Sequence, residues 1–192
     1  MSHHTGLVIL LCWVCFFACI AIFAFSVKPT MEVTRGWRWS WLGLAVLIAA
    51  LFWSQREWRS RGAPLGMLLW RRTPGIGIAA DILALAGLAV AVWGRAVLGR
   101  NWNINPGLKE DHELIERGPY AYVRHPMYSG LCLMLLGTVI WFGNGIGFVL
   151  FLASLLGTWL KLREEEKLLT KHFGGNYRKY QARVKALIPW IF

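Results

Sequence analysis

Residues 127–160 have the sequence "MYSGLCLMLLGTVIWFGNGIGFVLFLASLLGTWL", which contains no Asp, Glu, Lys or Arg. At ~1.5 Å per residue, one helix over this stretch would be about 50 Å long, whereas the hydrocarbon core of a bilayer is roughly 30 Å thick. The motif "FGNGIG", residues 142–147, supplies a Gly-Asn-Gly turn near the middle. The stretch therefore predicts a hairpin of two membrane helices, each of about 16 residues.

Three further apolar runs precede this hairpin, over residues 6–27, 37–54 and 76–98. The chain is 56% hydrophobic, with a mean hydropathy of +0.45. The first run has no Lys or Arg before it and is long for a signal peptide, so we expect it to be a retained span. Together the runs predict an all-α polytopic membrane protein with about five transmembrane helices, a C-terminal helical hairpin and a tail helix.

We expect one integral membrane domain over residues 1–192. Residues 1–98 would form three N-terminal spans, and residues 99–192 would form a second region that contains the hairpin. No low-complexity tract or internal repeat divides the sequence.

The net charge of +11 is distributed unevenly about the apolar runs. Five crossings would place the tail, the loop after the first span and residues 99–126 on one side, with 15 Lys and Arg residues against five on the other. The positive-inside rule then places the tail and residues 99–126 in the cytoplasm. Basic residues at the ends of spans meet lipid phosphates, so we expect no nucleic-acid partner.

Few polar residues lie within the runs, and none indicates a metal site. All four cysteines are in apolar runs without a His or carboxylate beside the first three, so we expect packing roles and no bound metal. Arg95 lies near the end of a span, where a long side chain is expected to snorkel to the surface. Asp81 is too short to do so, and the sequence assigns it no role.

A group of basic and aromatic residues stands directly before the hairpin, in "GPYAYVRHPMYSG", residues 118–130. Pro126 suits the first turn of a helix, which places His125 at the helix N-terminus, a position that favours an anion. Arg124 adds a bidentate binder of carboxylate or phosphate. The alternative is a basic collar that only caps a helix at the membrane surface. Ring faces for a planar base or a cation come from Tyr120, Tyr122 and Tyr128.

A second polar segment, "KLREEEKLLTKHFGGNYRKYQ", follows the hairpin at residues 161–181. It predicts a charged helix that stops at Gly174 and Gly175. Three adjacent glutamates usually form a solvated face, but here they begin where a span ends and are placed to bind an ammonium. Because a hairpin returns the chain to its starting side, we expect this segment to lie near residues 118–130. No phosphate-binding loop, H-E-x-x-H or G-x-S-x-G motif is present.

The two polar segments together resemble the isoprenylcysteine carboxyl methyltransferase family, and membrane phospholipid N-methyltransferases share much of the pattern. The first block is G-P-Y-x-x-x-R-H-P-x-Y-x-G at residues 118–130, and the second is E-E-x-x-L-x-x-x-F-G-x-x-Y-x-x-Y at residues 165–180. "LGRNW", residues 98–102, and "HELIERG", residues 112–118, also resemble the family. The resemblance covers the C-terminal half of the chain.

The resemblance implies S-adenosylmethionine as methyl donor, bound by the last two helices and the loops beside them, so residues 99–192 would form the cofactor-binding region that contains the hairpin. In the eukaryotic members an Arg four residues before the Glu165 position is tied to substrate, and this sequence has Lys161 there, with Arg163 two residues on. The catalytic candidates are therefore Arg124, Lys161 and Arg163. The cofactor-binding residues implied by position are His112, Glu113, Leu114, Ile115, Tyr120, His125, Pro126, Met127, Tyr128 and Glu165.

We therefore expect an S-adenosylmethionine-dependent methyltransferase that acts on a lipid-like acceptor, with the cofactor site facing the cytoplasm. Cationic side chains near the site favour a carboxylate acceptor, such as that of an isoprenylcysteine. The alternatives are a phospholipid N-methyltransferase with an amine acceptor, an NADPH-dependent sterol-type reductase, whose chains are much longer, and a membrane scaffold without activity. The sequence leaves the acceptor and the oligomeric state open.

Overall fold

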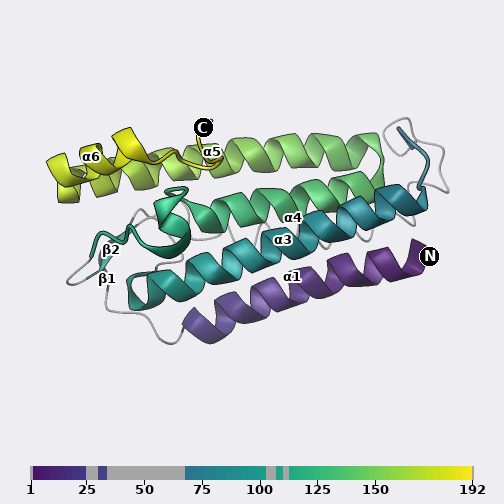
Figure 1. Ribbon diagram of the computed structural model, residues 1–192, viewed down its shortest axis with the longest axis horizontal. Coiled ribbons are helices and arrows are strands. Elements are labelled where there is room, and N and C mark those ends of the chain that lie inside the picture. The colour runs from purple at the N-terminus through teal and green to yellow at the C-terminus, as the bar shows by residue number, and fades with distance from the viewer. Residues whose placement is uncertain (1, 25–29, 34–67, 103–106, 110–112, 192) are drawn as a thin grey trace.

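The computed structural model describes residues 2–24, 30–33, 68–102, 107–109 and 113–191 (Figure 1). The expected span over residues 37–54 lies outside the described residues. The elements are α1 (Ser2–Ala24), β1 (Thr30–Val33), α3 (Pro74–Leu98), η3 (Gly99–Asn101), β2 (Gly107–Lys109), η4 (Gly118–Ala121), α4 (Pro126–Phe142), α5 (Gly145–Phe173) and α6 (Gly175–Arg183).

The long helices of the described part of the chain, α1, α3, α4 and α5, run along the long axis of the molecule, with α3 between α1 and α4 (Figure 1). Among the described residues, three helical stretches are long and apolar enough to cross a membrane, namely His4–Phe23, Pro74–Asn101 and Gly145–Phe173, and α4 is a shorter apolar helix. The chain is thus a helical membrane protein, as the apolar runs predict. The N-terminus lies at the end of the bundle opposite to α6.

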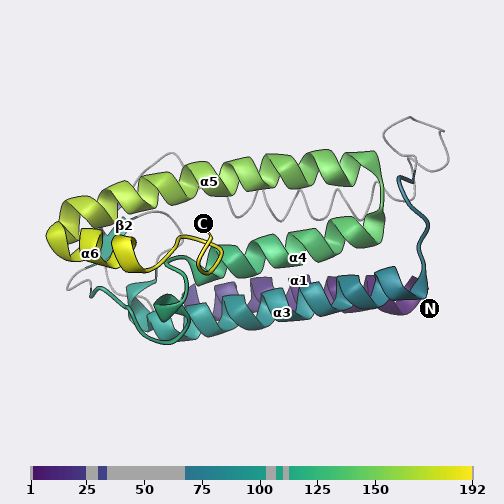
Figure 2. The same cartoon turned by 45° about the horizontal axis from the view of Figure 1, so that its top comes forward.

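The predicted hairpin is present, and its second helix is longer than expected. Gly143 takes a left-handed conformation, with φ +63°, and the side chain of Asn144 caps α5 by accepting from the N–H of Gly147 at 2.8 Å. Helix α5 then runs antiparallel to α4 (Figure 2) and continues through the charged segment to Phe173. The expected length of about 16 residues for this second helix is therefore wrong, because the charged residues after Leu160 are good helix formers and continue it to the predicted stop at Gly174. A tail helix, α6, then follows.

Glycines let α3 and α4 approach closely. A Cβ atom on Gly87 would lie 2.5 Å from the carbonyl oxygen of Gly130, and one on Gly137 would lie 2.6 Å from that of Ala80. Small residues at a helix interface are the usual means of close packing in membranes. Near the C-terminal end of α3, Gly94 packs against Pro126 and Met127, which fixes the first turn of α4 against α3.

Two long-range polar contacts fasten α1 to this pair of helices. The indole Nε1 of Trp13 donates to the hydroxyl of Thr138 at 3.0 Å. Arg95 is 1% exposed and donates from Nη2 to the carbonyl oxygen of Phe23 at 2.8 Å, while its guanidinium lies 4.6 Å from the ring centre of Trp102. The snorkelling expected for Arg95 is therefore wrong, since carbonyl groups and aromatic rings from other elements solvate the buried cation.

The structure also contains a small two-stranded sheet, which the sequence pattern does not predict. Strands β1 and β2 pair antiparallel, with Thr30 opposite Lys109 and Val33 opposite Gly107. The loop prediction for residues 30–33 is wrong in this detail. Strands of three or four residues have little pattern of their own and depend on a partner that is distant in the sequence.

Candidate functional site

The N-terminus of α4 is held by the C-terminal segment of the chain, residues 184–191. The sequence pattern does not predict this contact. The backbone N–H of Arg124 donates to the carbonyl oxygen of Lys185 at 2.8 Å, and that of His125 donates to Ala186 at 3.0 Å. The hydroxyl of Ser129 also donates to the carbonyl oxygen of Leu187 at 2.6 Å. These bonds fix the backbone from which the Arg124 and His125 side chains project.

Arg124 forms a largely buried ion pair with Glu166 of α5. Its Nε donates to Oε1 of Glu166 at 2.7 Å, its Nη2 lies 2.6 Å from the same oxygen, and its Nη1 donates to the carbonyl oxygens of Gln181 and Val184. The two side chains are 10% and 19% exposed. All three guanidinium nitrogens thus have partners within the protein, which ties α4, α5 and the C-terminal segment together.

Glu166 receives bonds from two more side chains. Nε2 of His125 lies 3.2 Å from Oε1 of Glu166, and Nε2 of Gln181 donates to Oε2 at 3.3 Å. A carboxylate bonded in this way is held in its charged form and in one orientation. Glu166 is therefore the centre of a polar cluster drawn from α4, α5 and α6.

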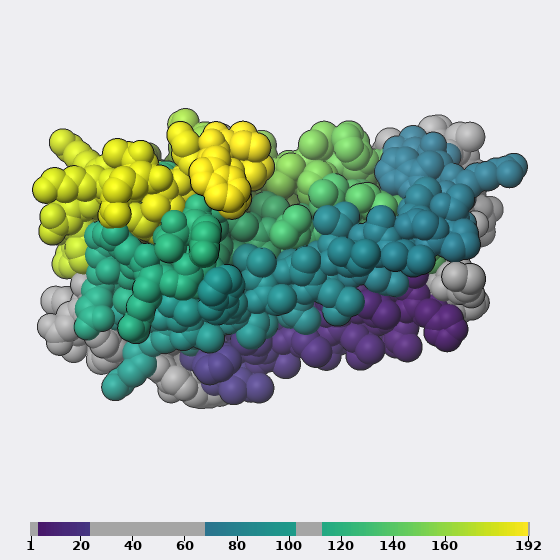
Figure 3. Space-filling model, in the orientation of Figure 1, coloured from purple at the N-terminus to yellow at the C-terminus, as the bar shows by residue number. Residues whose placement is uncertain are grey.

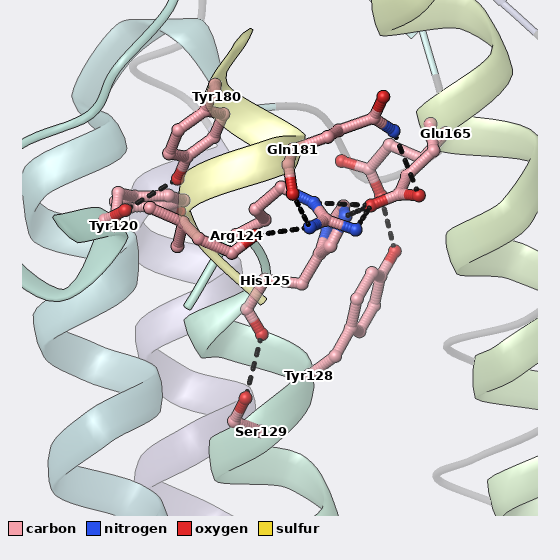
Figure 4. Close-up of polar contacts among 10 residues, drawn as sticks. Tyr120, Arg124, His125, Tyr128, Ser129, Glu165, Tyr180 and Gln181 are labelled. Atoms are coloured by element: carbon pink, nitrogen blue, oxygen red, sulfur yellow. Dashed lines mark hydrogen bonds and ion pairs between the residues drawn. The ribbon is translucent and has the colours of Figure 1, made fainter. Parts of the chain in front are cut away.

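Glu165, the neighbouring carboxylate, faces a different group. The hydroxyl of Tyr128 donates to its Oε2 at 2.9 Å, and the ring of His125 stacks on that of Tyr128 with centroids 5.7 Å apart (Figure 4). Lys161, one turn before Glu165 on α5, is 5% exposed, and its Nζ lies 5.9 Å from the centre of the Tyr128 ring. A carboxylate, an ammonium and two aromatic rings thus meet where α4 begins.

Buried tyrosines form a wall beside the cluster. The hydroxyl of Tyr180 donates to the carbonyl oxygen of Tyr120 at 2.6 Å, and that of Tyr120 donates to Gly94 at 3.3 Å. Tyr177 and Tyr180 pack with Val184 and Leu114. Burial raises the pKa values of Tyr120, Tyr177 and Tyr180 well above the usual range, so these phenols stay protonated at neutral pH.

The other residues that the family resemblance implies for cofactor binding differ in their exposure and contacts. Glu113 is exposed, and Leu114 and Ile115 are half-buried in the irregular segment before η4. The side chains of Pro126 and Met127 lie against Gly94 of α3. His112 lies outside the described residues.

The structure does not bring Arg163 to the cluster. Arg163 is exposed, and its guanidinium carbon lies 4.5 Å from the ring centre of Trp159. Residues two apart on a helix point to different sides, so Arg163 and the buried Lys161 cannot face the same group. Of the three catalytic candidates, Lys161 and Arg124 are at the cluster.

Sequence reasoning missed Glu166 and Gln181 as members of the cluster. The adjacent glutamates could have been predicted as partners of Arg124 and His125, because the hairpin returns the chain to these basic residues and a buried basic residue favours a carboxylate beside it. Gln181 and the carbonyl groups of residues 184–186 carry no such signal. Within the part of the chain that the structure describes, no group of three or more His, Cys, Asp or Glu side chains is placed to bind a metal ion.

Comparisons with known proteins agree on one group of enzymes. A profile of the phospholipid methyltransferase family matches residues 76–176. Protein-S-isoprenylcysteine O-methyltransferase of Schizosaccharomyces pombe is 39% identical over 83 residues, which are 43% of this chain and 35% of that protein. The enzyme of the same name from Tribolium castaneum is 34% identical over 122 residues, covering 57% of this chain and 42% of that protein. The chain thus spans less than half the length of these relatives.

A solved structure has a similar fold. It is that of the eukaryotic intramembrane Ras methyltransferase ICMT (isoprenylcysteine carboxyl methyltransferase). The superposition covers 83% of this chain and 55% of that chain, with a TM-score of 0.52 and 22% sequence identity. The arrangement of membrane helices described above therefore occurs in a known protein.

Proposed function

The chain belongs to the phospholipid methyltransferase family, and from this we propose that it transfers a methyl group from S-adenosylmethionine to the carboxylate of a lipid-like acceptor such as an isoprenylcysteine. The names of its relatives support this choice of acceptor over the amine of a phospholipid. The observation that carries the proposal is the buried Lys161 beside Tyr128, one helical turn from Glu165.

The residues at the cluster fit the chemical groups of S-adenosylmethionine. Glu165 offers a carboxylate for the ammonium group, and its bond from Tyr128 holds it in place. The stacked rings of His125 and Tyr128 offer faces for a planar base or a sulfonium. When bound, S-adenosylmethionine supplies an activated methyl group on a positively charged sulfur. We assign cofactor contacts to the side chains of Tyr120, His125, Tyr128 and Glu165 and to the backbone of residues 112–115, Pro126 and Met127.

Lys161 is the cation that we assign to the carboxylate of the acceptor. Arg124 is engaged by Glu166 and by carbonyl oxygens, and Arg163 stacks on Trp159 at an exposed position. We therefore assign Arg124 a positioning role and give Arg163 no role in the reaction. A carboxylate acceptor is already deprotonated at neutral pH, so the site needs no general base. Its residues need only hold and align the two reactants, which is a large contribution in itself.

An apolar cavity of about 550 Å³ beside the cluster supports a lipid-like acceptor. Its lining comes from α3, α4, α5 and the C-terminal segment, and it includes Val123 and Ser129, which flank the cluster in the chain. The C-terminal segment, yellow in Figure 3, lies on the surface over this region. A cavity of this kind suits a hydrocarbon chain whose polar end reaches the cluster. The lining residues nearest the C-terminus are Leu187, Ile188 and Pro189.

We place the cluster on the cytoplasmic side of the membrane. The charged residues of α5 and α6 lie at that end of the bundle, and positive charge marks the cytoplasmic side of membrane proteins. A water-soluble cofactor would then reach the cluster from the cytoplasm, while the acceptor would arrive from the bilayer.

Two measurements on the full chain in lipid nanodiscs test the proposal. Calorimetry is expected to show S-adenosylmethionine binding that Glu165→Gln weakens about tenfold, as loss of a charged hydrogen bond predicts. NADPH is the competing ligand, and Glu164→Gln is the matched control. Transfer of labelled methyl is then expected to N-acetyl-S-farnesylcysteine and not to its methyl ester or to phosphatidylethanolamine. Binding of NADPH alone, or methylation of the amine lipid alone, would contradict the proposal.

A further inference from the structure

A second pocket lies at the end of the bundle opposite to the cluster, and charged side chains are part of its lining. It has a volume of about 250 Å³ and forms where the first turns of α1 and α3 meet the last turn of α4. Asp81, one of its lining residues, is 13 positions from Gly94, the residue of α3 that packs on the start of α4. That separation is ~20 Å along a helix, so this pocket is separate from the cofactor site.

Asp81 has an unsatisfied oxygen in this pocket. Its Oδ2 accepts from the hydroxyl of Thr5 at 3.2 Å, while its Oδ1 is buried and has no hydrogen-bond partner in the part of the chain that the structure describes. Gly77 permits the first contact, since a Cβ atom there would lie 3.0 Å from the Thr5 hydroxyl oxygen. A buried carboxylate oxygen without a donor is costly, and it indicates that a donor comes from outside the protein.

Positive charge lines the other side of the same pocket. Nη2 of Arg72 donates to the carbonyl oxygen of Phe142 at 3.2 Å, and its guanidinium carbon lies 4.7 Å from the ring centre of Trp141. These contacts fix the guanidinium at the pocket wall, next to the N-terminal turn of α3 that begins at Pro74. The guanidinium of Arg72 and the N-terminus of α3 both favour an anionic group, and a phosphate can accept two hydrogen bonds from a guanidinium. A simple cation is disfavoured here, because Arg72 would repel it.

The pocket continues into an apolar track on the surface of α3. Ile78 lines the pocket and is 56% exposed, and Ile82 and Leu85 follow it at 60% and 52% exposure. Their spacing of four and three residues places all three on one face of the helix. This face runs from the pocket toward the middle of a membrane-spanning segment, where an acyl chain would lie.

We propose that this pocket binds the head group of a phospholipid that carries a primary ammonium, of the phosphatidylethanolamine type, from the leaflet opposite to the cluster. The ammonium donates to Oδ1 of Asp81, the phosphate lies against Arg72, and an acyl chain follows Ile78 and Ile82. The ligand is bound and not methylated, because none of the cluster residues lies at this end. The proposal does not depend on the function proposed above.

Native mass spectrometry of the full chain in detergent tests the proposal with phosphatidylethanolamine, phosphatidylcholine and phosphatidylglycerol of matched acyl chains. Phosphatidylethanolamine is expected to bind about tenfold more tightly than phosphatidylcholine, which has no ammonium N–H to donate. Asp81→Asn is expected to abolish this preference, and Arg72→Gln to weaken all three lipids. The matched control is Arg71→Gln, since Arg71 is exposed and does not line the pocket.

A second measurement on the unmodified chain covers the case in which Asp81→Asn does not fold. Carbodiimide labelling of Asp81 is expected to fall when phosphatidylethanolamine is added and to stay unchanged with phosphatidylcholine. Equal binding of the two lipids, or a preference that Asp81→Asn leaves intact, would overturn the proposal. Competition by soluble phosphoethanolamine at concentrations equal to those of the lipid would also overturn it, since the acyl track would then contribute nothing.

Discussion

Nε of Arg124 donates to Oε1 of Glu166 at 2.7 Å, although the two residues lie 42 positions apart in the chain. One residue stands just before α4 and the other lies within the last third of α5, so the bond closes the open end of the hairpin opposite to its Gly143 turn. His125 and Gln181 contact the same carboxylate. The pair thus holds in place the helix end from which His125 and Tyr128 project.

Glu166→Gln is expected to destabilise the protein strongly. The substitution leaves the guanidinium of Arg124, only 10% exposed, without its counter-charge. Removing one partner of a buried ion pair costs about 3–5 kcal/mol. Thermal unfolding in nanodiscs measures the effect, with Glu164→Gln as control. Glu164 pairs with Lys167 at an exposed site, where a pair contributes about 0.2–1 kcal/mol. Equal losses in the two variants would show that Glu166 has no special place in the fold.

Lys161→Met is expected to lower methyl transfer by about a hundredfold, the usual loss when a positioned electrostatic group is removed. Methionine keeps most of the length and apolar contact of the lysine stem, so the effect reports the charge. The control is Arg163→Met on the same helix, which should leave turnover within about twofold, because Arg163 is exposed beside Trp159. Steady-state rates at saturating S-adenosylmethionine provide the readout. The reverse order of the two effects would move the acceptor to the other side of α5.

Gly87→Ala is expected to destabilise the packing of α3 against α4. The added Cβ would lie 2.5 Å from the carbonyl oxygen of Gly130 and 2.7 Å from the backbone N of Met134, and neither backbone atom can move without shifting α4. Overpacking of this kind costs about 1–3 kcal/mol. Gly157→Ala on α5 is the matched control, since nothing lies within 4 Å of its added Cβ. It should stabilise by about 0.5–1 kcal/mol, which denaturant titration resolves.

Two tyrosines of the buried wall should respond differently to loss of the hydroxyl. Tyr180→Phe removes the 2.6 Å bond to the carbonyl oxygen of Tyr120 and should destabilise by about 1 kcal/mol. Tyr177→Phe should be neutral or stabilising, because the Tyr177 hydroxyl is buried without a partner among the described residues. Thermal shifts of the two variants, measured side by side, test this order. A larger loss for Tyr177→Phe would indicate a partner for its hydroxyl.

The main features of the fold follow from local properties of the sequence. A charge-free run broken by Gly143 and Asn144 is enough to predict the hairpin, and the hairpin is enough to bring the blocks around His125 and Glu165 together. The boundaries of the apolar runs also predict the first and last residues of α1 and α3 to within a few residues.

The errors arise where a residue's partner is distant in the sequence. Arg95 is buried because the carbonyl of Phe23 and the ring of Trp102 surround it, and neither is visible from the local pattern. The sequence-based prediction includes no partner for Arg124, and Glu166 pairs with it because successive residues of a helix are rotated by about 100°, so the three adjacent glutamates face different ways. The backbone bonds from Arg124 and His125 to residues 185 and 186 leave no trace in side-chain patterns.

Alkaline hydrolysis of the reaction product distinguishes transfer to a carboxylate from transfer to an amine. The full chain in nanodiscs is supplied with methyl-labelled S-adenosylmethionine and N-acetyl-S-farnesylcysteine, and the recovered lipid is treated with base. An ester releases its label as volatile methanol, whereas an N-methyl amine does not. We expect labelled lipid whose methyl group is released by base and whose formation falls with Lys161→Met. Label that stays on the lipid after base, or that appears only on phosphatidylethanolamine, would contradict it.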